Sequence, residues 1–579
     1  MKANLVVPDI RDNYIENLLT AYGIQDLEKY LNPTFESIQN PKDFNNIKEG
    51  AEVLINSCNN KERILLIVDC DCDGFTSAAI FYQYVKRIWP DIDIEYRLHE
   101  GKQHGLEDHI DWIESNPIYG LIVLPDSSSN DKEYHDRLLP YGIKCLILDH
   151  HITDVELSDN AIVINNQLSE KYLNKDLTGA GVVYQFCRYL DSVLDKNYAN
   201  DYIDLAALGI DGDMGSLLNI ENRTILDYGF KNINNFFFKC LIDKQSYSMG
   251  GKITPISVAF YIVPLINAMI RVGTMAEKER MFLAFIDGQH MVPSNKRGAK
   301  GTLEMVAIES ARECTNARNH QNKFKEEMVE KLSKKIDDEN LLQNKILFIR
   351  LEDDMDFPSE LNGLVCMNLV SKYKRPAIVA RLNKDGEIKG SARGLNQSEL
   401  ESFKNFLTDS GFFMYAQGHD NAFGIGIEDR ELGEFHKYAN NALKDINFNE
   451  SVYDVQFVRE GKDLDINDII EISDTYSNIW GTDVPEPLIY IKKIYITPKD
   501  VQIMGKNQDT LKITYNGIAY MKFHAKEMIA ELSKCEGNME LEVIGRGNVN
   551  EWGGRKTSQI FIDNYNIIQL KDNNNILDF

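Results

Sequence analysis

Three aspartates spaced two residues apart follow an apolar run early in the chain. Residues 65–75 read L-L-I-V-D-C-D-C-D-G-F, so Asp69, Asp71 and Asp73 come directly after a segment typical of a buried strand. Side chains alternate along an extended backbone, which predicts that the three carboxylates start out on one face. Carboxylates this close repel one another, and hard divalent cations would neutralise them. On this segment alone, a metal site and a solvated acidic turn are equally good interpretations.

Further segments carry potential ligands after apolar runs. Residues 143–151 read I-K-C-L-I-L-D-H-H, residues 121–126 read L-I-V-L-P-D, and residues 206–214 read A-A-L-G-I-D-G-D-M. In open α/β sheets, ligands bind beyond the carboxyl ends of the strands, where side chains from several segments converge. The repeated delivery of Asp or His at the end of an apolar run therefore favours a metal site over solvated loops.

The composition is that of an ordinary globular protein with a strong acidic excess. The 579 residues include 26% charged and 43% hydrophobic residues, enough for roughly three to five domains. The net charge of −26 argues against simple coating of nucleic acid, although it decides little about a local groove. No apolar stretch approaches the length of a membrane span, and the N-terminus lacks the apolar region of a signal peptide. No membrane partner is therefore expected.

Nine scattered cysteines argue for a reducing compartment, so we expect a cytoplasmic protein. Cys70 and Cys72 lie between the aspartates and are predicted to pack as small apolar residues. A thiolate metal site would need partners at C-x-x-C spacing, which are missing.

The order of patterns along the chain predicts an α/β protein with several parts. From about 60 to 215, short apolar runs alternate with helical patterns, which indicates a parallel sheet of βαβ units. Residues 217–300 are mostly helical in pattern, and residues 301–340 predict one or two long amphipathic helices. A second α/β unit follows at 345–447, and short alternating strands after about 450 indicate a small β-barrel.

Together these segments resemble a known family. The triplet Asp149-His150-His151, preceded by D-C-D-C-D-G and followed by A-L-G-I-D-G-D, resembles the DHH phosphoesterase superfamily, and within it the RecJ-like single-strand-specific DNA exonucleases. Other matching segments occur in the family's order: His104-Gly105-Leu106, residues 177–183, 221–223, 266–271, 389–393 and 417–424.

The resemblance implies four parts. A parallel-sheet DHH domain with an N-terminal extension would span residues 1–300, and a connecting helix would span 301–344. A smaller α/β DHHA1 domain that binds substrate would span 345–449, and a β-barrel of the OB type would span 450–579.

The resemblance also implies a site. Two divalent ions, Mn²⁺ or Mg²⁺, would be held by six residues: Asp69, Asp71, Asp73, Asp126, His150 and Asp213. Asp126 would bridge the ions, and Asp69 is either a ligand or an outer partner. Asp126 and His151 are the expected catalytic residues. His151 would orient the nucleophile or donate to a phosphate, and a supporting hydrogen-bonding role is an equal alternative. Substrate phosphates would be bound by a second set: Asn267, Arg271, Ser391, Arg393, Gly418 and His419.

Several positions depart from the family pattern. Asp126 is followed by Ser127–Ser129 where the family has D-x-G, the segment Gly209–Asp213 contains an extra acid, and Ala416–Gly418 replaces a glycine-rich loop. Asp149 is expected to hold the imidazole of a neighbouring histidine. Asp211 has no counterpart in the family and is expected to be an exposed loop acid.

Three functions are compatible with these residues. The first is a metal-dependent exonuclease on single-stranded DNA, of 5′→3′ polarity, acting in repair, recombination or replication, with a single-strand-binding protein or a helicase as possible partners. The second is a phosphodiesterase for short oligonucleotides or cyclic dinucleotides, which would not need the long bridging segment or the β-rich C-terminal part. The third, a non-catalytic scaffold, would be expected to lose the acidic ligands, which are present.

Overall fold

A five-stranded parallel sheet positions the segments identified above. Its strands follow the spatial order β3 (Ile94–Leu98), β2 (Ile64–Val68), β4 (Leu121–Pro125), β5 (Lys144–Asp149) and β6 (Ala161–Asn165). Every residue of β2 and β4 is buried, as expected of a sheet covered on both faces. The predicted parallel α/β sheet is confirmed.

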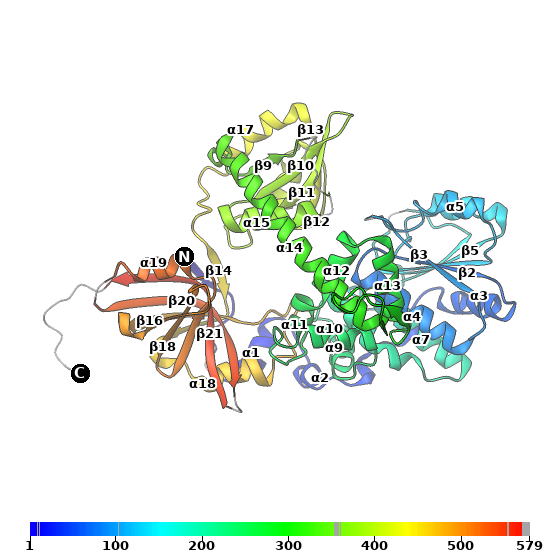
Figure 1. Ribbon diagram of the computed structural model, residues 1–579, viewed down its shortest axis with the longest axis horizontal. Coiled ribbons are helices and arrows are strands. Elements are labelled where there is room, and N and C mark those ends of the chain that lie inside the picture. The colour runs from blue at the N-terminus through cyan, green and yellow to red at the C-terminus, as the bar shows by residue number, and fades with distance from the viewer. Residues whose placement is uncertain are drawn as a thin grey trace. The chain divides into compact units, whose positions relative to one another are not determined.

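Helices cover both faces of this sheet (Figure 1). On one face, α3 (Ile47–Asn59), α4 (Cys72–Ile88) and α7 (Gly179–Leu194) pack on β2, β4, β5 and β6. On the other face, Leu65, Ile122 and Ile147 share a buried cluster with Ile110 and Ile113 of α5 (Ile110–Ser115). The core therefore lies on both sides of the sheet and leaves its carboxyl edge to the loops.

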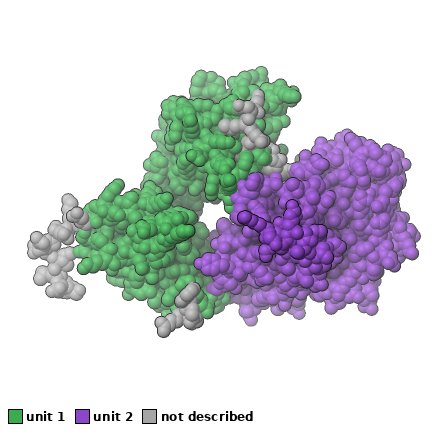
Figure 2. Space-filling view, in the orientation of Figure 1, with its two compact units in different colours: residues 1–21, 322–476, 486–579 green, residues 22–321, 477–485 purple. Residues whose placement is uncertain are grey.

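The computed structural model describes residues 1–579 except 9, 11, 102, 154, 353–357, 359–360, 536, 553–554 and 570–579. Figure 2 shows two compact units in this chain. Unit 2 comprises residues 22–321 and 477–485, and unit 1 comprises residues 1–21, 322–476 and 486–579. The four-part division expected from the sequence stays a prediction.

Unit 2 continues with helices after the sheet. They are α8 (Ile203–Gly212), α9 (Ile220–Lys231), α10 (Phe236–Gln245), α11 (Pro255–Tyr261), α12 (Val263–Val272) and α13 (Met275–Ile286), with the short elements α2 (Leu27–Leu31), α6 (Lys132–Arg137), β7 (Met291–Pro293) and β8 (Leu303–Met305) completing the unit. The expected long connecting helix is confirmed as α14 (Val306–Asp338), a single helix of 33 residues.

Two local predictions were wrong. The apolar run at 206–214 is not a strand end, because it belongs to helix α8, whose residues 203–211 are all buried. A short apolar run of this kind cannot be told from a buried helix by periodicity. The aspartates after β2 do not continue in an extended conformation either, since α4 begins at Cys72 and the Asp71 side chain accepts a hydrogen bond from Gly74 N.

One stretch departs from the expectation that no apolar segment approaches the length of a membrane span. Residues 255–272, which form α11 and α12, are long and apolar enough to cross a membrane by length and composition. Because 56% of that stretch is buried inside the protein, it has the character of a core helix pair, and one such stretch is weak evidence of a membrane segment.

Unit 1 contains two larger sheets. A mixed sheet has the order β12 (Phe413–His419), β13 (Ala422–Glu428), β11 (Glu387–Arg393), β10 (Ala377–Leu382) and β9 (Leu347–Arg350), accompanied by α15 (Asn362–Tyr373), α16 (Phe403–Asp409) and α17 (Leu432–Ala442). The parallel pairing of β9 with β10 across α15 confirms the predicted second α/β unit.

The C-terminal sheet has seven strands. Its order is β15 (Phe457–Glu460), β16 (Leu488–Ile496), β20 (Met539–Trp552), β21 (Arg555–Gln569), β19 (Ile518–Lys522), β18 (Thr510–Tyr515) and β17 (Val501–Met504), with α18 (Ile466–Ile470) and α19 (Lys526–Leu532) beside it. Within the described residues, β15 and β17 are the two edge strands of this sheet and do not pair with each other. Near the N-terminus, β1 (Lys2–Leu5) pairs with β14 (Val452–Val455), and α1 (Tyr14–Ala21) follows.

Candidate metal centre

The strand order places a topological switch point between β2 and β4. In a sheet of order β3-β2-β4-β5-β6, the connections from β2 and β4 lead away in opposite directions, which opens a ligand site beyond their carboxyl ends. Asp69 directly follows β2 and Asp126 directly follows β4. The backbone turns sharply at Asp126, which has a φ of 65°. The topology therefore brings these two carboxylates to one place.

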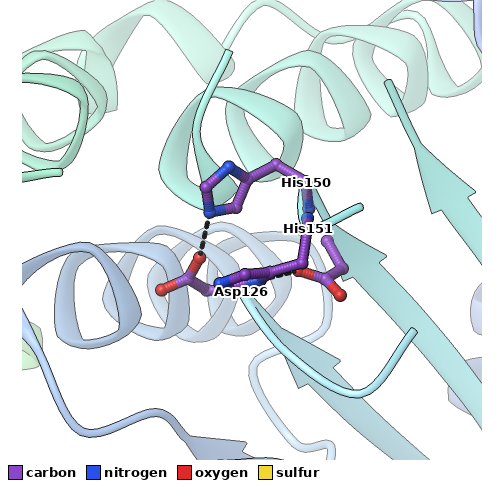
Figure 3. A group of neighbouring side chains, drawn as sticks. Asp126, His150 and His151 are labelled. Carbon is purple, nitrogen blue, oxygen red and sulfur yellow. Dashed lines mark hydrogen bonds and ion pairs between the residues drawn. The ribbon is translucent and has the colours of Figure 1, made fainter. Parts of the chain in front are cut away.

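The six residues predicted as ligands fall into two neighbouring groups. Ligand atoms of Asp69, Asp71 and Asp126 lie within 4.8 Å of one another, and those of Asp73, His150 and Asp213 do the same. The groups meet where His150 Nε2 lies 3.2 Å from Asp126 Oδ1, as Figure 3 shows. The same nitrogen lies 3.6 Å from Asp213 Oδ2. Two cation positions that share Asp126 fit this arrangement.

Burial leaves this cluster electrostatically unbalanced. Asp69 and Asp126 are each at most 2% exposed, and Oδ1 of each makes no hydrogen bond within the described residues. The contact of Asp126 with His150 is close but not aligned as a hydrogen bond. Burial first, and then the charge of Asp73, raise the pKa of Asp126 well above its usual range. Burial likewise raises the pKa of Asp69 to about 6 and that of Asp213 to about 8.

These observations fit divalent cations. Buried carboxylates without partners are costly, and a cation would both pair with them and restore their ionised form. Burial lowers the pKa of His150, which keeps its imidazole neutral and able to coordinate a metal. The donor set of carboxylate oxygens and one imidazole suits Mn²⁺ or Mg²⁺.

Asp73 is held by the start of α7. Its carboxylate accepts hydrogen bonds from Thr178 Oγ1 at 2.9 Å, Gly179 N at 2.7 Å and Ala180 N at 3.0 Å. Backbone N–H groups at a helix N-terminus favour a negative charge. Burial nevertheless raises the pKa of Asp73, so these donors offset only part of the cost.

Two glycines allow neighbouring segments of the chain to lie close to the carboxylates of Asp126 and Asp73. A Cβ on Gly179 would lie 2.4 Å from Asp126 Oδ1, and a Cβ on Gly209 would lie 2.3 Å from Asp73 Oδ1. The contribution of Thr178 and Gly179 to the site was missed from the sequence. The signal was the segment T-G-A-G at 178–181, which lies within the matching segment 177–183 and was given no role in the site.

Asp149 and His151 form a pair beside the cluster. Asp149 Oδ1 lies 2.8 Å from His151 Nδ1 and accepts from His150 N, while Oδ2 accepts from Ser129 N at 3.0 Å. Burial alone would raise the pKa of Asp149, but the bond from His151 holds it well below its usual range. The same bond raises the pKa of His151 to about 9. Asp149 thus holds the imidazole of its neighbour, as expected.

A segment distant in sequence supports the loop that carries Asp213. Residues 477–485 belong to unit 2, although unit 1 flanks them in the sequence. Leu217 N donates to Thr482 O at 3.0 Å, and Trp480 in the same segment is 1% exposed. This segment therefore anchors the chain four residues after Asp213.

The departures from the family pattern have distinct structural outcomes. Ser128 has a φ of 81°, a region that favours glycine, and its hydroxyl donates to Asp131 Oδ2 at 2.5 Å. Asp211 is not an exposed loop acid as expected: it is 8% exposed at the end of α8, and burial raises its pKa well above the usual range. Asp211 therefore lies in a buried helix and not in the exposed loop that was expected.

The residues predicted to bind phosphates lie in both units. Asn267 and Arg271 are on α12 of unit 2, and the other four are in the mixed sheet of unit 1: Ser391, Arg393, Gly418 and His419. In that sheet, Ser391 pairs with Gly424, and Gly418 pairs with Phe423, so both flank β13.

The second set is more open than the acidic cluster. Gly418 has a φ of 133°, and it and His419 are exposed at the end of β12. Arg393 is half-buried, and a Cβ on Gly363 would lie 2.3 Å from its Nη2. Burial lowers the pKa of Arg393 from its usual value. The guanidinium nevertheless remains a cationic donor at neutral pH.

Comparisons with known proteins identify relatives of this chain. Residues 63–210 match a model of the DHH family, N-terminal domain, and residues 463–564 match a model of the RecJ OB domain. The chain is 35% identical over 564 residues, 96% of each chain, to a Bacillus subtilis protein named as an SPbeta prophage-derived single-strand DNA-specific exonuclease, YorK.

Two further relatives carry the name RecJ. The single-stranded-DNA-specific exonuclease RecJ of Bacillus subtilis is 24% identical over 569 residues, covering 95% of this chain and 67% of the relative. The crystal structure of Thermus thermophilus RecJ in complex with Mn²⁺ superposes with a TM-score of 0.71 at 16% identity, over 98% of this chain and 79% of that one. The fold is therefore shared along nearly the whole chain.

Proposed function

The chain belongs to the RecJ family of single-strand DNA-specific exonucleases, and on that premise we propose that it hydrolyses single-stranded DNA from the 5′ end with two divalent metal ions. The observation that carries the two-metal part is the pair of three-residue donor groups that meet at Asp126, with buried carboxylate oxygens that lack hydrogen-bond partners.

Asp69, Asp71 and Asp126 would hold one ion. Asp73, His150 and Asp213 would hold the other, with Asp126 shared between the two. When bound, the two Mn²⁺ or Mg²⁺ ions would supply a water activated near neutral pH and compensation for charge on the phosphoryl oxygens. Asp73 presents its carboxylate in a fixed orientation, because three donors of α7 hold it.

His151 acts as a cationic donor rather than as a base. Its pKa of about 9, raised by the hydrogen bond to Asp149, keeps a proton on both ring nitrogens at neutral pH. The side chain is 51% exposed, so its free N–H can reach a substrate. A charge-assisted bond to a phosphoryl oxygen would orient the scissile phosphate. This favours the phosphate-donating role among the alternatives for His151.

The second set of residues binds the DNA backbone. Asn267 and Arg271 would contact phosphates near the metal ions. Ser391, Arg393, Gly418 and His419 would bind a further phosphate, for which an arginine fork and a backbone of positive φ are suited. Single-stranded DNA is thus the partner, in repair, recombination or replication. The nine free cysteines, all within the described residues, are compatible with work in a reducing cytoplasm, where a single-strand-binding protein or a helicase would supply substrate.

End-labelled single strands test the proposal. With Mn²⁺ or Mg²⁺, the protein should release mononucleotides from the 5′ end, and Asp126→Ala should abolish release. Unchanged activity in Asp126→Ala would remove the two-metal assignment. Release from the 3′ end would overturn the polarity, and activity confined to dinucleotides or cyclic dinucleotides would favour the small-substrate phosphodiesterase.

A further inference from the structure

A second group of donor atoms surrounds Asp69 on the side of β3. Cys70 Sγ lies 3.8 Å from His104 Nε2, and His104 Nδ1 lies 2.7 Å from Asp69 Oδ2. Ligand atoms of these three residues all lie within 4.8 Å of one another. None of the carboxylates assigned to the candidate metal centre other than Asp69 belongs to this group.

A buried histidine lies beside this group, next to Asp69. The His99 side chain, which directly follows β3, has 0% exposure, and neither of its ring nitrogens makes a hydrogen bond within the described residues. Its Nε2 lies 3.9 Å from Asp69 Oδ1, which also has no hydrogen bond there. Its Nδ1 lies 3.8 Å from Asp108 Oδ2. Buried polar atoms are normally paired, so the two unpartnered ring nitrogens of His99 indicate a group bound beside them.

The chemistry of the four donors selects the kind of ion. Two imidazoles, one thiolate and one carboxylate form a set typical of Zn²⁺, whereas Mg²⁺ and Mn²⁺ prefer oxygen-rich sites. Donors around a tetrahedral zinc ion lie about 3.3–3.8 Å apart. The Cys70–His104 separation of 3.8 Å is within this range, the His99–Asp69 separation of 3.9 Å is slightly longer, and the His104–Asp69 separation of 2.7 Å is that of a hydrogen bond. The charges of one thiolate and one carboxylate balance those of a divalent ion. His104, whose side chain is 56% exposed, has room to exchange its bond to Asp69 for a metal bond.

We propose that Asp69, Cys70, His99 and His104 form a closed four-donor site for Zn²⁺ or a similarly borderline divalent ion, adjacent to the catalytic pair and sharing Asp69 with it. With four protein donors, the ion has no open position for substrate, so its role is structural. It ties the segment after β3 to the end of β2 and orients Asp69. The thiol loses its proton to solvent when the ion binds.

The sequence did not predict this site, because the proposed partners of Cys70 are histidines in the segment that follows β3 and not a second cysteine. Cys72 behaves as predicted, since it is 1% exposed in the first turn of α4 with Sγ 3.9 Å from Leu208 O. The two cysteines therefore form a matched pair for an experiment.

Cobalt is the probe. The full-length protein, stripped of metal and then saturated with Mg²⁺ to fill the oxygen-rich positions, is titrated with Co²⁺. We expect one equivalent of Co²⁺ to produce the thiolate-to-cobalt charge-transfer band and the intense visible absorption of a tetrahedral ion, and one equivalent of Zn²⁺ to remove both. Neither readout depends on nuclease activity, so the result stands apart from the proposed function.

Variants decide which residues hold the ion. Cys70→Ser should remove the charge-transfer band, and Cys72→Ser should retain it. His104→Gln, at a half-exposed position that folding tolerates, should weaken Co²⁺ binding at least about tenfold, as expected for the loss of one ligand. The absence of the band in the unchanged protein, its survival in Cys70→Ser, or equal binding in His104→Gln would each overturn the proposal.

Discussion

The acidic cluster at the end of the parallel sheet differs from the proposed phosphate-binding face of the mixed sheet in how deeply its polar groups are buried. Asp69, Asp73 and Asp126 are almost fully buried, and burial raises the pKa of each. Gly418 and His419, by contrast, are exposed to solvent. The first region is destabilised until cations bind, whereas the second is an open surface that an anionic ligand can approach without any such cost.

The largest effect is expected at Asp126. Asp126→Ala should lower kcat on single-stranded DNA by about 10³-fold or more, because in the proposed site this carboxylate is shared by both cation positions and acts in the transition state. Steady-state kinetics with Mn²⁺ would measure this. A loss of less than tenfold would show that the two regions do not differ as described.

Stability should change in the opposite sense at the same residue. In metal-free buffer, Asp126→Asn should raise the free energy of unfolding by about 1 kcal/mol, because folding must either protonate this buried carboxyl group or bury its charge, and Asn avoids that cost. Asp149→Asn is the matched control: that carboxylate is hydrogen-bonded on both oxygens, so its loss should cost about 2 kcal/mol. Urea denaturation would compare them. Equal signs for the two variants would contradict the distinction.

Substitutions on the open face should act through substrate binding. His419→Ala should raise KM about tenfold while leaving kcat nearly unchanged, since one charge-assisted phosphate contact contributes about 1.4 kcal/mol. Lys404, which donates to Gly418 O at 2.8 Å, offers a neighbouring control. A fall in kcat of the same size as the rise in KM would place His419 in the chemical step instead.

A smaller effect concerns pH. Burial and the charge of Asp73 raise the pKa of Asp213 to about 8, whereas an unfolded aspartate titrates near 4. Between these values the folded chain retains a proton that the unfolded chain has lost, so this residue makes stability fall as pH rises. In EDTA, the free energy of unfolding relative to Asp213→Asn should therefore decrease from pH 5 to pH 8. A constant or increasing difference would refute the raised pKa.

The smallest effect is expected at Asp211. Burial raises the pKa of Asp211 well above its usual range and so favours the neutral acid, which Asn resembles in shape and charge. Asp211→Asn should change activity less than about twofold and stability by less than about 1 kcal/mol. Metal titration with activity as the readout would check this. A strong loss of metal affinity would move Asp211 into the acidic cluster.

The sequence alone was sufficient for the main architecture and the candidate ligands. Apolar runs that end in Asp69, Asp126 and His150 predicted strand ends, and parallel strands deliver their carboxyl ends to one edge. The long helix α14 and the α/β pattern around α15 were also predicted, because an uninterrupted helical period and alternating elements are local properties of the chain.

Only the tertiary structure decided how these residues are grouped and which of them lack partners. The burial of Asp211 depends on α8 being a core helix, and the close approach of α7 to Asp126 depends on the absence of a side chain at Gly179. The meeting of Cys70 with His99 and His104 likewise arises because β2 and β3 are neighbours in the sheet. Spacing in a sequence fixes which side chains a segment carries, but burial and charge balance depend on segments that only folding brings together.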